Sequence, residues 1–170
     1  TGTEQTQMDW EVAPDGLRDT LVALHREYAP REIVISENGA AYPDQVDRDG
    51  RVHDDARIAY LARHVAAAAE ALDAGVPLTG YHAWSLMDNY EWSLGYTRRF
   101  GLVHVDFETQ RRTPKDSADW YSRLIAASVS EVARRDEVRR APAPSSKVSY
   151  LMVLARMLHL DCSPMRHVRL

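Results

Sequence analysis

The chain has 170 residues, of which 45% are hydrophobic and 27% are charged, and its net charge is −4. This balance is unlike that of a disordered chain and predicts one soluble globular domain with a sizeable core. The negative net charge offers no general basic surface to nucleic acid. The sequence contains no run of about 18 apolar residues, so it does not predict a helix that crosses a membrane.

Cysteine and histidine usage bears on cofactors and compartment. Cys162 is the only cysteine, which excludes an internal disulfide and a cysteine-built zinc site and favours a reducing compartment, so we expect a cytoplasmic protein. The histidines include no HExxH motif or other paired metal-ligand spacing. We therefore predict no metal site and no cofactor.

The first predicted elements are a helix and a strand. The helix begins near Pro14, a residue suited to a first helical turn, and ends before Pro30. Its apolar residues recur at helical spacing and are Leu17, Leu21, Leu24 and Tyr28. The β-branched run at residues 33–36 then predicts a strand, which leads directly into Glu37.

A second helix and strand follow a loop rich in turn residues. Asp54 or Asp55 is placed to cap this helix, and Gly75 and Pro77 end it. Its apolar stripe consists of Ile58, Leu61, Val65 and Leu72. Residues 78–86, "LTGYHAWSL", are rich in strand formers and predict the second strand.

The rest of the chain divides near residue 130. Residues 101–113 predict a hairpin and residues 114–128 a last helix. Residues 1–130 carry 21 acidic and 13 basic side chains, whereas residues 131–170 carry 4 and 8. We therefore interpret residues 131–170 as a divergent tail in which a linker, "APAPSS", precedes a short amphipathic helix over about residues 148–160.

Strands separated by helices of this length predict an α/β fold with parallel βαβ units, buried on both faces. Parallel strands present ligand-binding residues at their carboxyl ends, in a closed barrel as in an open doubly wound sheet. Both polar clusters of the chain, "ENG" and "WSLMDNYEW", follow predicted strands. We thus expect Glu37, Trp84, Glu91 and Trp92 to be neighbours across one mouth.

The residue types in this mouth suggest a sugar ligand. Tryptophan rings stack on sugar rings, and carboxylates accept hydrogen bonds from hydroxyls. Two carboxylates can also act as nucleophile and acid in glycoside hydrolysis, and the pattern alone nominates Glu37 and Glu91. The alternative is that Glu37 only caps a turn and that Trp84 and Trp92 belong to the core.

Two segments resemble glycoside hydrolase family 1, the family of many β-glucosidases. "IVISENG" at residues 33–39 resembles the nucleophile motif of that family, and residues 80–121, "GYHAWSLMDNYEWSLGYTRRFGLVHVDFETQRRTPKDSADWY", resemble its closing segment. The resemblance spans about residues 8–128. It implies a retaining β-glycosidase in which residues 1–130 form the C-terminal part of a TIM (β/α)8 barrel, about its last two βα units.

The resemblance also implies a role for each candidate residue. Glu37 would be the nucleophile that forms a glycosyl-enzyme. Trp84 would lie under the sugar, whereas Glu91 and Trp92 would bind sugar hydroxyls. This interpretation makes Glu91 a recognition residue in place of an acid. It favours a glucose- or galactose-type sugar over a phosphorylated one, and it makes a terminal β-D-glucosyl residue the expected substrate.

The chain departs from the family in what it lacks. A (β/α)8 barrel takes about 250 residues, and the Asn-Glu-Pro motif that carries the family's acid/base glutamate is absent from this sequence. We expect a C-terminal fragment whose isolated form is inactive and self-associates, or is complemented by the missing N-terminal barrel half. The alternative function is an inactive sugar-binding or complementing fragment. Neither nucleic acid nor membrane is an expected partner.

Overall fold

The computed structural model of the protein describes residues 2–140. Its elements are α1 (Pro14–Tyr28), β1 (Ile33–Asn38), α2 (Asp55–Asp73), β2 (Leu78–Ala83), η1 (Trp92–Leu94), β3 (Val103–Val105), β4 (Arg112–Pro114) and α3 (Asp116–Arg140). The linker at residues 141–146 and the helix expected at residues 148–160 lie outside the described residues. Within the described part, no helix has the length and apolar character needed to cross a membrane.

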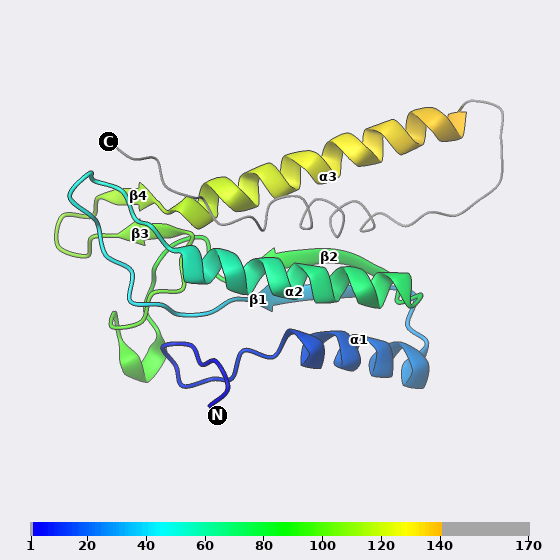
Figure 1. Cartoon of the computed structure of the whole chain (residues 1–170), viewed down its shortest axis with the longest axis horizontal. Coiled ribbons are helices and arrows are strands. Elements are labelled where there is room, and N and C mark those ends of the chain that lie inside the picture. Colours follow the sequence, from blue (N-terminus) through cyan, green and yellow to red (C-terminus); the bar gives the residue numbers. More distant parts are fainter. Residues whose placement is uncertain (1, 141–170) are drawn as a thin grey trace.

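The two longer strands form a parallel βαβ unit, as the sequence predicts. β1 pairs with β2, and α2 connects them (Figure 1). Both strands point toward the end of the molecule where η1 and the antiparallel β3–β4 hairpin lie. The residues that follow β1 and β2 therefore meet at one end of the structure.

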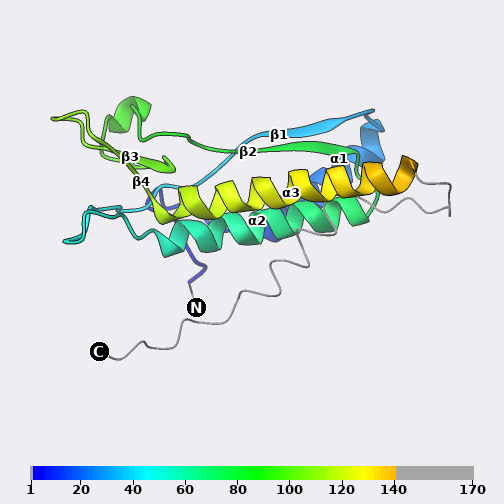
Figure 2. The same cartoon turned by 90° about the horizontal axis from the view of Figure 1, so that it is seen from above.

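The helices cover only one face of this strand pair. α2 and α3 lie on the same side of β1 and β2 (Figure 2), and Leu21, Ile35 and Leu78 join one buried cluster with small residues of α2. On the opposite face, Val34 keeps 44% of its surface exposed. The prediction that the strands are buried on both faces is therefore wrong for the described residues, because nothing in them covers the second face.

Sequence signals set the ends of α1 and α2. Pro14 occupies the first turn of α1, and Ala29 closes that helix in a left-handed conformation directly before Pro30. Gly75, at φ +95°, follows α2 in a conformation that favours glycine. Asp54 is the N-cap residue of α2, as predicted, but its side chain makes no cap hydrogen bond, so that part of the capping prediction is wrong.

The other boundaries differ modestly from prediction. β1 extends two residues beyond the predicted end at residue 36, and β2 stops at Ala83 instead of residue 86. α3 continues past the predicted end at residue 128 to Arg140. Residues 128–141 contain no glycine or proline, so the sequence offers no backbone signal that would end this helix earlier.

Candidate active site

Glu37 lies at the carboxyl end of β1 with its side chain exposed. The pairing of β1 with β2 changes register between Ile35 and Asn38. Strict alternation would turn Glu37 to the same face as Ile35, which packs in the core. Because a register change breaks this alternation, the strand can bury Ile35 and still leave the Glu37 carboxylate in solvent.

Asn38 ties the end of β1 to β2. The Tyr81 hydroxyl donates a hydrogen bond to Asn38 Oδ1 at 2.7 Å, and the Trp84 backbone N–H donates to the Asn38 carbonyl oxygen at 2.9 Å. Burial raises the pKa of the Tyr81 phenol, with a smaller contribution from neighbouring tyrosines, so the phenol keeps the proton that it donates. These bonds bring the backbone next to Glu37 against the start of the loop that carries Trp84.

Gly39 lets the two chain segments approach closely. A Cβ atom at this position would lie 1.8 Å from the Trp84 carbonyl oxygen. Only glycine fits there without moving the Trp84 backbone, which explains the glycine in "SENG" in physical terms. The structure thus brings Glu37 and Trp84 to adjacent strand ends, as expected.

Glu91 and Trp92 lie further along the loop that follows β2. The short helix η1 begins at Trp92, and the Glu91 N–H donates to the Gly95 carbonyl oxygen at 2.7 Å. Trp92 is 82% exposed and Glu91 is half-buried. Trp84 is also accessible to solvent. The alternative that both tryptophans are core residues is therefore wrong.

Buried charges support these loops, and sequence patterns did not reveal them. Asp88, in the loop after β2, accepts hydrogen bonds from Lys115 at 2.9 Å, from Arg99 at 2.6 Å and from the Gly101 N–H at 3.0 Å. Burial by itself would raise the pKa of Asp88, but the charges and hydrogen bonds of Lys115 and Arg99 outweigh it and hold this pKa below its ordinary value. Asp88 therefore stays ionised inside the fold.

The contacts of Asp54 show why its side chain does not cap α2. Its carboxylate accepts hydrogen bonds from Arg57 at 2.9 Å and from the Ser117 N–H and hydroxyl at 2.8 and 2.5 Å. The side chain thus serves the start of α3 and a buried arginine instead of the first turn of α2. A local capping rule cannot anticipate this, because Ser117 is distant in sequence.

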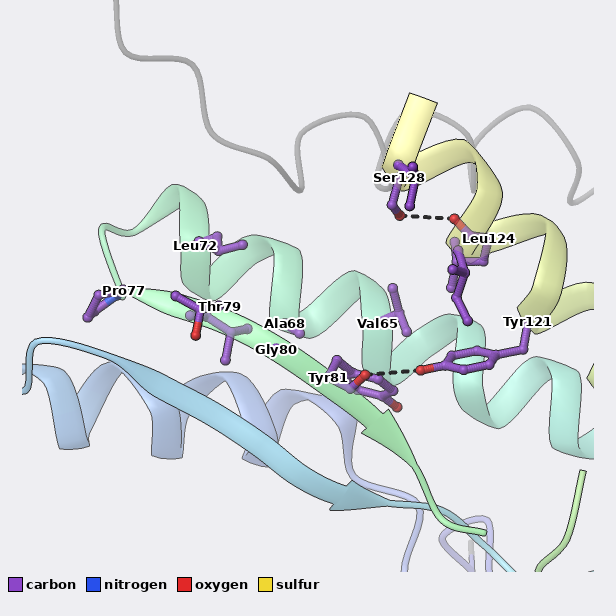
Figure 3. A pocket seen from close by; sticks show the side chains of 13 residues that line it. Val65, Ala68, Leu72, Pro77, Thr79, Gly80, Tyr81, Tyr121, Leu124 and Ser128 are labelled. Atoms are coloured by element: carbon purple, nitrogen blue, oxygen red, sulfur yellow. Dashed lines mark hydrogen bonds between the residues drawn. The ribbon is translucent and has the colours of Figure 1, made fainter. Parts of the chain in front are cut away.

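An apolar groove lies away from the Glu37 end of the strands. It has a volume of about 500 Å³ and lies between α2, β2 and α3 (Figure 3). The α3 side chains that line it include Tyr121, Leu124, Ile125 and Val129. The Tyr121 hydroxyl donates to the Tyr81 carbonyl oxygen at 3.0 Å, which fixes α3 over the edge of β2 that β1 does not occupy.

Residues 2–140 contain no group of three or more His, Cys, Asp or Glu side chains arranged to hold a metal ion. The chemistry available at the carboxyl ends of β1 and β2 is that of one exposed carboxylate, a second glutamate and two accessible tryptophan rings. Such a set suits a ligand with hydroxyl groups and apolar ring faces.

Comparison of the sequence with models of known protein families identifies the family of this chain. The model described as "Glycosyl hydrolase family 1" matches residues 1–129. This chain belongs to glycosyl hydrolase family 1. The family resemblance read from "IVISENG" and from residues 80–121 is confirmed.

Several glycosidase relatives share about half of their aligned residues with the chain. "Beta-glucosidase A" of Thermotoga maritima is 51% identical over 121 residues, which are 71% of this chain and 27% of that protein. A "Bifunctional beta-D-glucosidase/beta-D-fucosidase" of Bifidobacterium breve is 50% identical over 130 residues, 74% of this chain and 28% of that protein. A "6-phospho-beta-galactosidase" of Streptococcus equi subsp. zooepidemicus is 46% identical over 129 residues, 75% of this chain and 27% of that protein.

Solved structures give the same picture for the fold. The family 1 β-glucosidase from Thermotoga maritima in complex with isofagomine lactam superposes with a TM-score of 0.73 at 49% identity. The alignment covers 74% of this chain and 29% of that structure. Family 1 β-glucosidases are TIM barrels. The chain therefore spans between a quarter and a third of the length of these relatives.

Proposed function

We propose that the chain supplies the nucleophile-bearing, C-terminal part of a retaining β-glycosidase barrel, with β1 and β2 as its last two strands. The observation that carries this proposal is the exposed Glu37 carboxylate at the end of a parallel strand, beside Trp84, in a family 1 chain. Family 1 relatives that span the same segment are β-glucosidases and 6-phospho-β-galactosidases.

In the proposed reaction, the Glu37 carboxylate attacks the anomeric carbon and the bond from that carbon to the aglycone oxygen breaks. The departing oxygen takes a proton from a general acid outside this chain. Water then attacks the glycosyl-enzyme ester, loses a proton to the conjugate base of the same acid, and releases the sugar and free Glu37.

We propose that the substrate carries a terminal β-D-glucosyl residue. Trp84 would stack on its ring, and Glu91 and Trp92 would bind its hydroxyls. The β-glucosidase relatives support this choice at 48–51% identity, although the phosphosugar enzyme is only slightly more distant at 46%. Rates on an aryl β-glucoside and on its 6-phospho-β-galactoside counterpart would distinguish these substrates.

The test of the nucleophile uses this chain assembled with the complementary part of the Thermotoga maritima β-glucosidase. We expect hydrolysis of an aryl β-glucoside by the assembly and none by the chain alone, which lacks the family's Asn-Glu-Pro motif. Glu37→Gln should lower kcat by at least about 1,000-fold, because the amide is a poor nucleophile. Glu108→Gln changes an exposed glutamate of the β3–β4 turn and is the matched control.

A labelling experiment adds a direct readout. A 2-deoxy-2-fluoro-β-glucoside with a dinitrophenyl leaving group needs no acid to release its aglycone, so it should attach the sugar to the peptide that contains Glu37. Equal labelling of the wild type and of Glu37→Gln, or hydrolysis that survives the substitution, would refute the nucleophile assignment.

A second candidate function is that of an inactive complementing fragment. The groove between α2, β2 and α3 favours it, as does the outer edge of β2, which pairs with no strand among residues 2–140. An apolar strand could pair with that edge beneath α3. The partner in this proposal is the remaining part of a family 1 barrel. Binding of that part without hydrolysis by the assembly would support this function over the first.

A further inference from the structure

Arg57 is a fully buried cation at the start of α2 and connects the two loops of the candidate active site. Only 2% of its surface is exposed. Toward the loop after β1, its guanidinium donates to the Ala40 carbonyl oxygen and to the Asp44 carboxylate. Toward the loop after β2, it donates to the Arg99 carbonyl oxygen at 3.1 Å. Ala40 lies just beyond Glu37, and Arg99 lies on the loop that also contains Trp84.

Lys115 makes a second connection between the same loops. This side chain, 1% exposed, donates to Asp44 at 2.6 Å and to Asp88 at 2.9 Å. Asp44 therefore accepts hydrogen bonds from both buried cations. Asp88 also accepts hydrogen bonds from the Gly101 and Val105 N–H groups at 3.0 and 3.3 Å.

The cluster is balanced in charge. It contains three carboxylates and three cations, which are Asp44, Asp54, Asp88, Arg57, Arg99 and Lys115. Burial and the neighbouring Arg57 charge lower the pKa of Lys115, whereas Asp44 and Asp88 act in the opposite direction. Breaking one pair would leave a buried charge without its partner, so the network favours one arrangement of the loops.

We propose that Arg57 is a positioning residue that holds the backbone after Glu37 against the loop that carries Trp84, Glu91 and Trp92. This role rests on the proposed function, because it sets the distance between the proposed nucleophile and the proposed sugar-binding side chains. Arg57 itself makes no hydrogen bond to Glu37 or to these three side chains. It acts through Ala40, Asp44 and Arg99.

The planar guanidinium suits this task better than an ammonium group. Arg57 donates to four acceptors in different directions, two of them backbone carbonyls on separate loops. Lysine keeps the charge but has a single nitrogen on a flexible chain and cannot reproduce this fork. Arg57→Lys is therefore a test of geometry at constant charge.

The experiment measures amide hydrogen exchange in the 170-residue chain and needs no catalysis. The Tyr42 N–H donates to the Arg99 carbonyl oxygen and reports the contact between the loops, and the Gly101 N–H reports Asp88. In Arg57→Lys we expect both amides to exchange at least about tenfold faster, with α1 amides unchanged. Arg63 lies on the same helix as Arg57 and pairs at the surface with Glu4 of the N-terminal segment, so Arg63→Lys should change neither amide.

A second variant protects the test against a folding failure. Asp44→Asn keeps the size of the side chain but removes the charge that Arg57 and Lys115 share, and it should speed exchange at the same two amides. Unchanged exchange at Tyr42, a uniform acceleration over all amides, or failure of both variants to fold would overturn the positioning role. In the assembled enzyme, Arg57→Lys should lower kcat more than it changes KM. Absence of activity in every form would refute the proposed function while leaving the exchange result intact.

Discussion

Gly39 has no room for a side chain, and this constraint lies two residues from the proposed nucleophile. Because a Cβ would lie 1.8 Å from the Trp84 carbonyl oxygen, alanine must push the two strand ends apart. We expect Gly39→Ala to lower the free energy of unfolding by about 1–3 kcal/mol, the usual cost of overpacking. Urea unfolding followed by circular dichroism measures it.

The control for this prediction is Gly16→Ala. Gly16 lies in α1, and its Cβ would be 3.7 Å from the Ala13 Cβ, an ordinary contact. Alanine in a helix should be neutral or stabilising by up to about 1 kcal/mol. Equal destabilisation by both substitutions would contradict the close contact between Gly39 and Trp84.

His53 connects the loop before α2 to the first turn of α3. Its Nδ1 lies 2.6 Å from an Asp116 oxygen and its Nε2 lies 3.1 Å from an Asp49 oxygen. The hydrogen bonds to Asp116 and then Asp49 raise the pKa of His53 above 6.5. A raised pKa means that the folded state binds the proton more tightly, so this stabilisation is full below pH 6.5 and is lost as pH rises through the raised pKa.

Comparing the wild type with His53→Gln isolates this effect. Burial lowers the pKa values of His64 and His104, and their opposite pH dependence cancels in the comparison. We expect the wild type to have the higher melting temperature at pH 5.5 and the difference to shrink by pH 8.5. A difference that is constant or grows with pH would rule out a stabilising protonated His53.

At the scale of elements, the sequence predicted α1, β1, α2 and β2 to within a few residues, because each combines a clear periodicity with a proline or glycine at its end. Glu37, Trp84, Glu91 and Trp92 could be nominated because they follow these strands. The buried charges that support the loops could not be predicted from the sequence. Asp44 and Lys115 are far apart along the chain and share no periodicity, and only the folded arrangement brings them to 2.6 Å.

The sequence pattern also could not predict that β1 and β2 are covered on one face only. Residues 33–35, "IVI", are apolar at consecutive positions, which predicts a strand covered on both sides. Whether a second layer exists depends on chain that packs there, not on the strand itself. The described residues provide α1, α2 and α3 on one side only.

Leu61 carries the contact between α2 and the segment beyond β2. It is buried in a cluster with Ala40, Tyr60 and Leu102. We expect Leu61→Ala to cost about 2–5 kcal/mol, the range for a buried leucine whose site cannot fully collapse. Leu24→Ala, at a position of α1 that is 41% exposed, should cost less than about 1 kcal/mol. Similar losses for the two variants in thermal unfolding would contradict this core assignment.

At the scale of the whole molecule, residues 2–140 leave both outer edges of the two-stranded sheet without a further strand and one of its faces without a helix. Ile125 and Val129 of α3 are 50% and 63% exposed and line the apolar groove beside β2. Exposed apolar residues next to a free strand edge favour association with another chain. We therefore expect the isolated chain to self-associate as its concentration rises.

The double substitution Ile125→Ser and Val129→Ser should shift the chain toward the monomer in sedimentation experiments. Val46→Ser, at an exposed position outside the groove, is the control and should leave the association unchanged. Adding the complementary part of a family 1 enzyme should compete with self-association of the wild type. Association that is insensitive to both treatments would place the contact elsewhere.

The buried charge network also bears on where such a domain could be divided by protein engineering. Asp44 and Asp88 obtain their shared counter-charge from Lys115, and Asp54 is satisfied by Ser117. A piece cut before Lys115 would contain both strands and every candidate site residue, yet it would keep only Arg57 and Arg99 as counter-charges for its three buried carboxylates. The smallest transplantable cassette therefore extends through Ser117, well beyond the last residue that would touch a sugar.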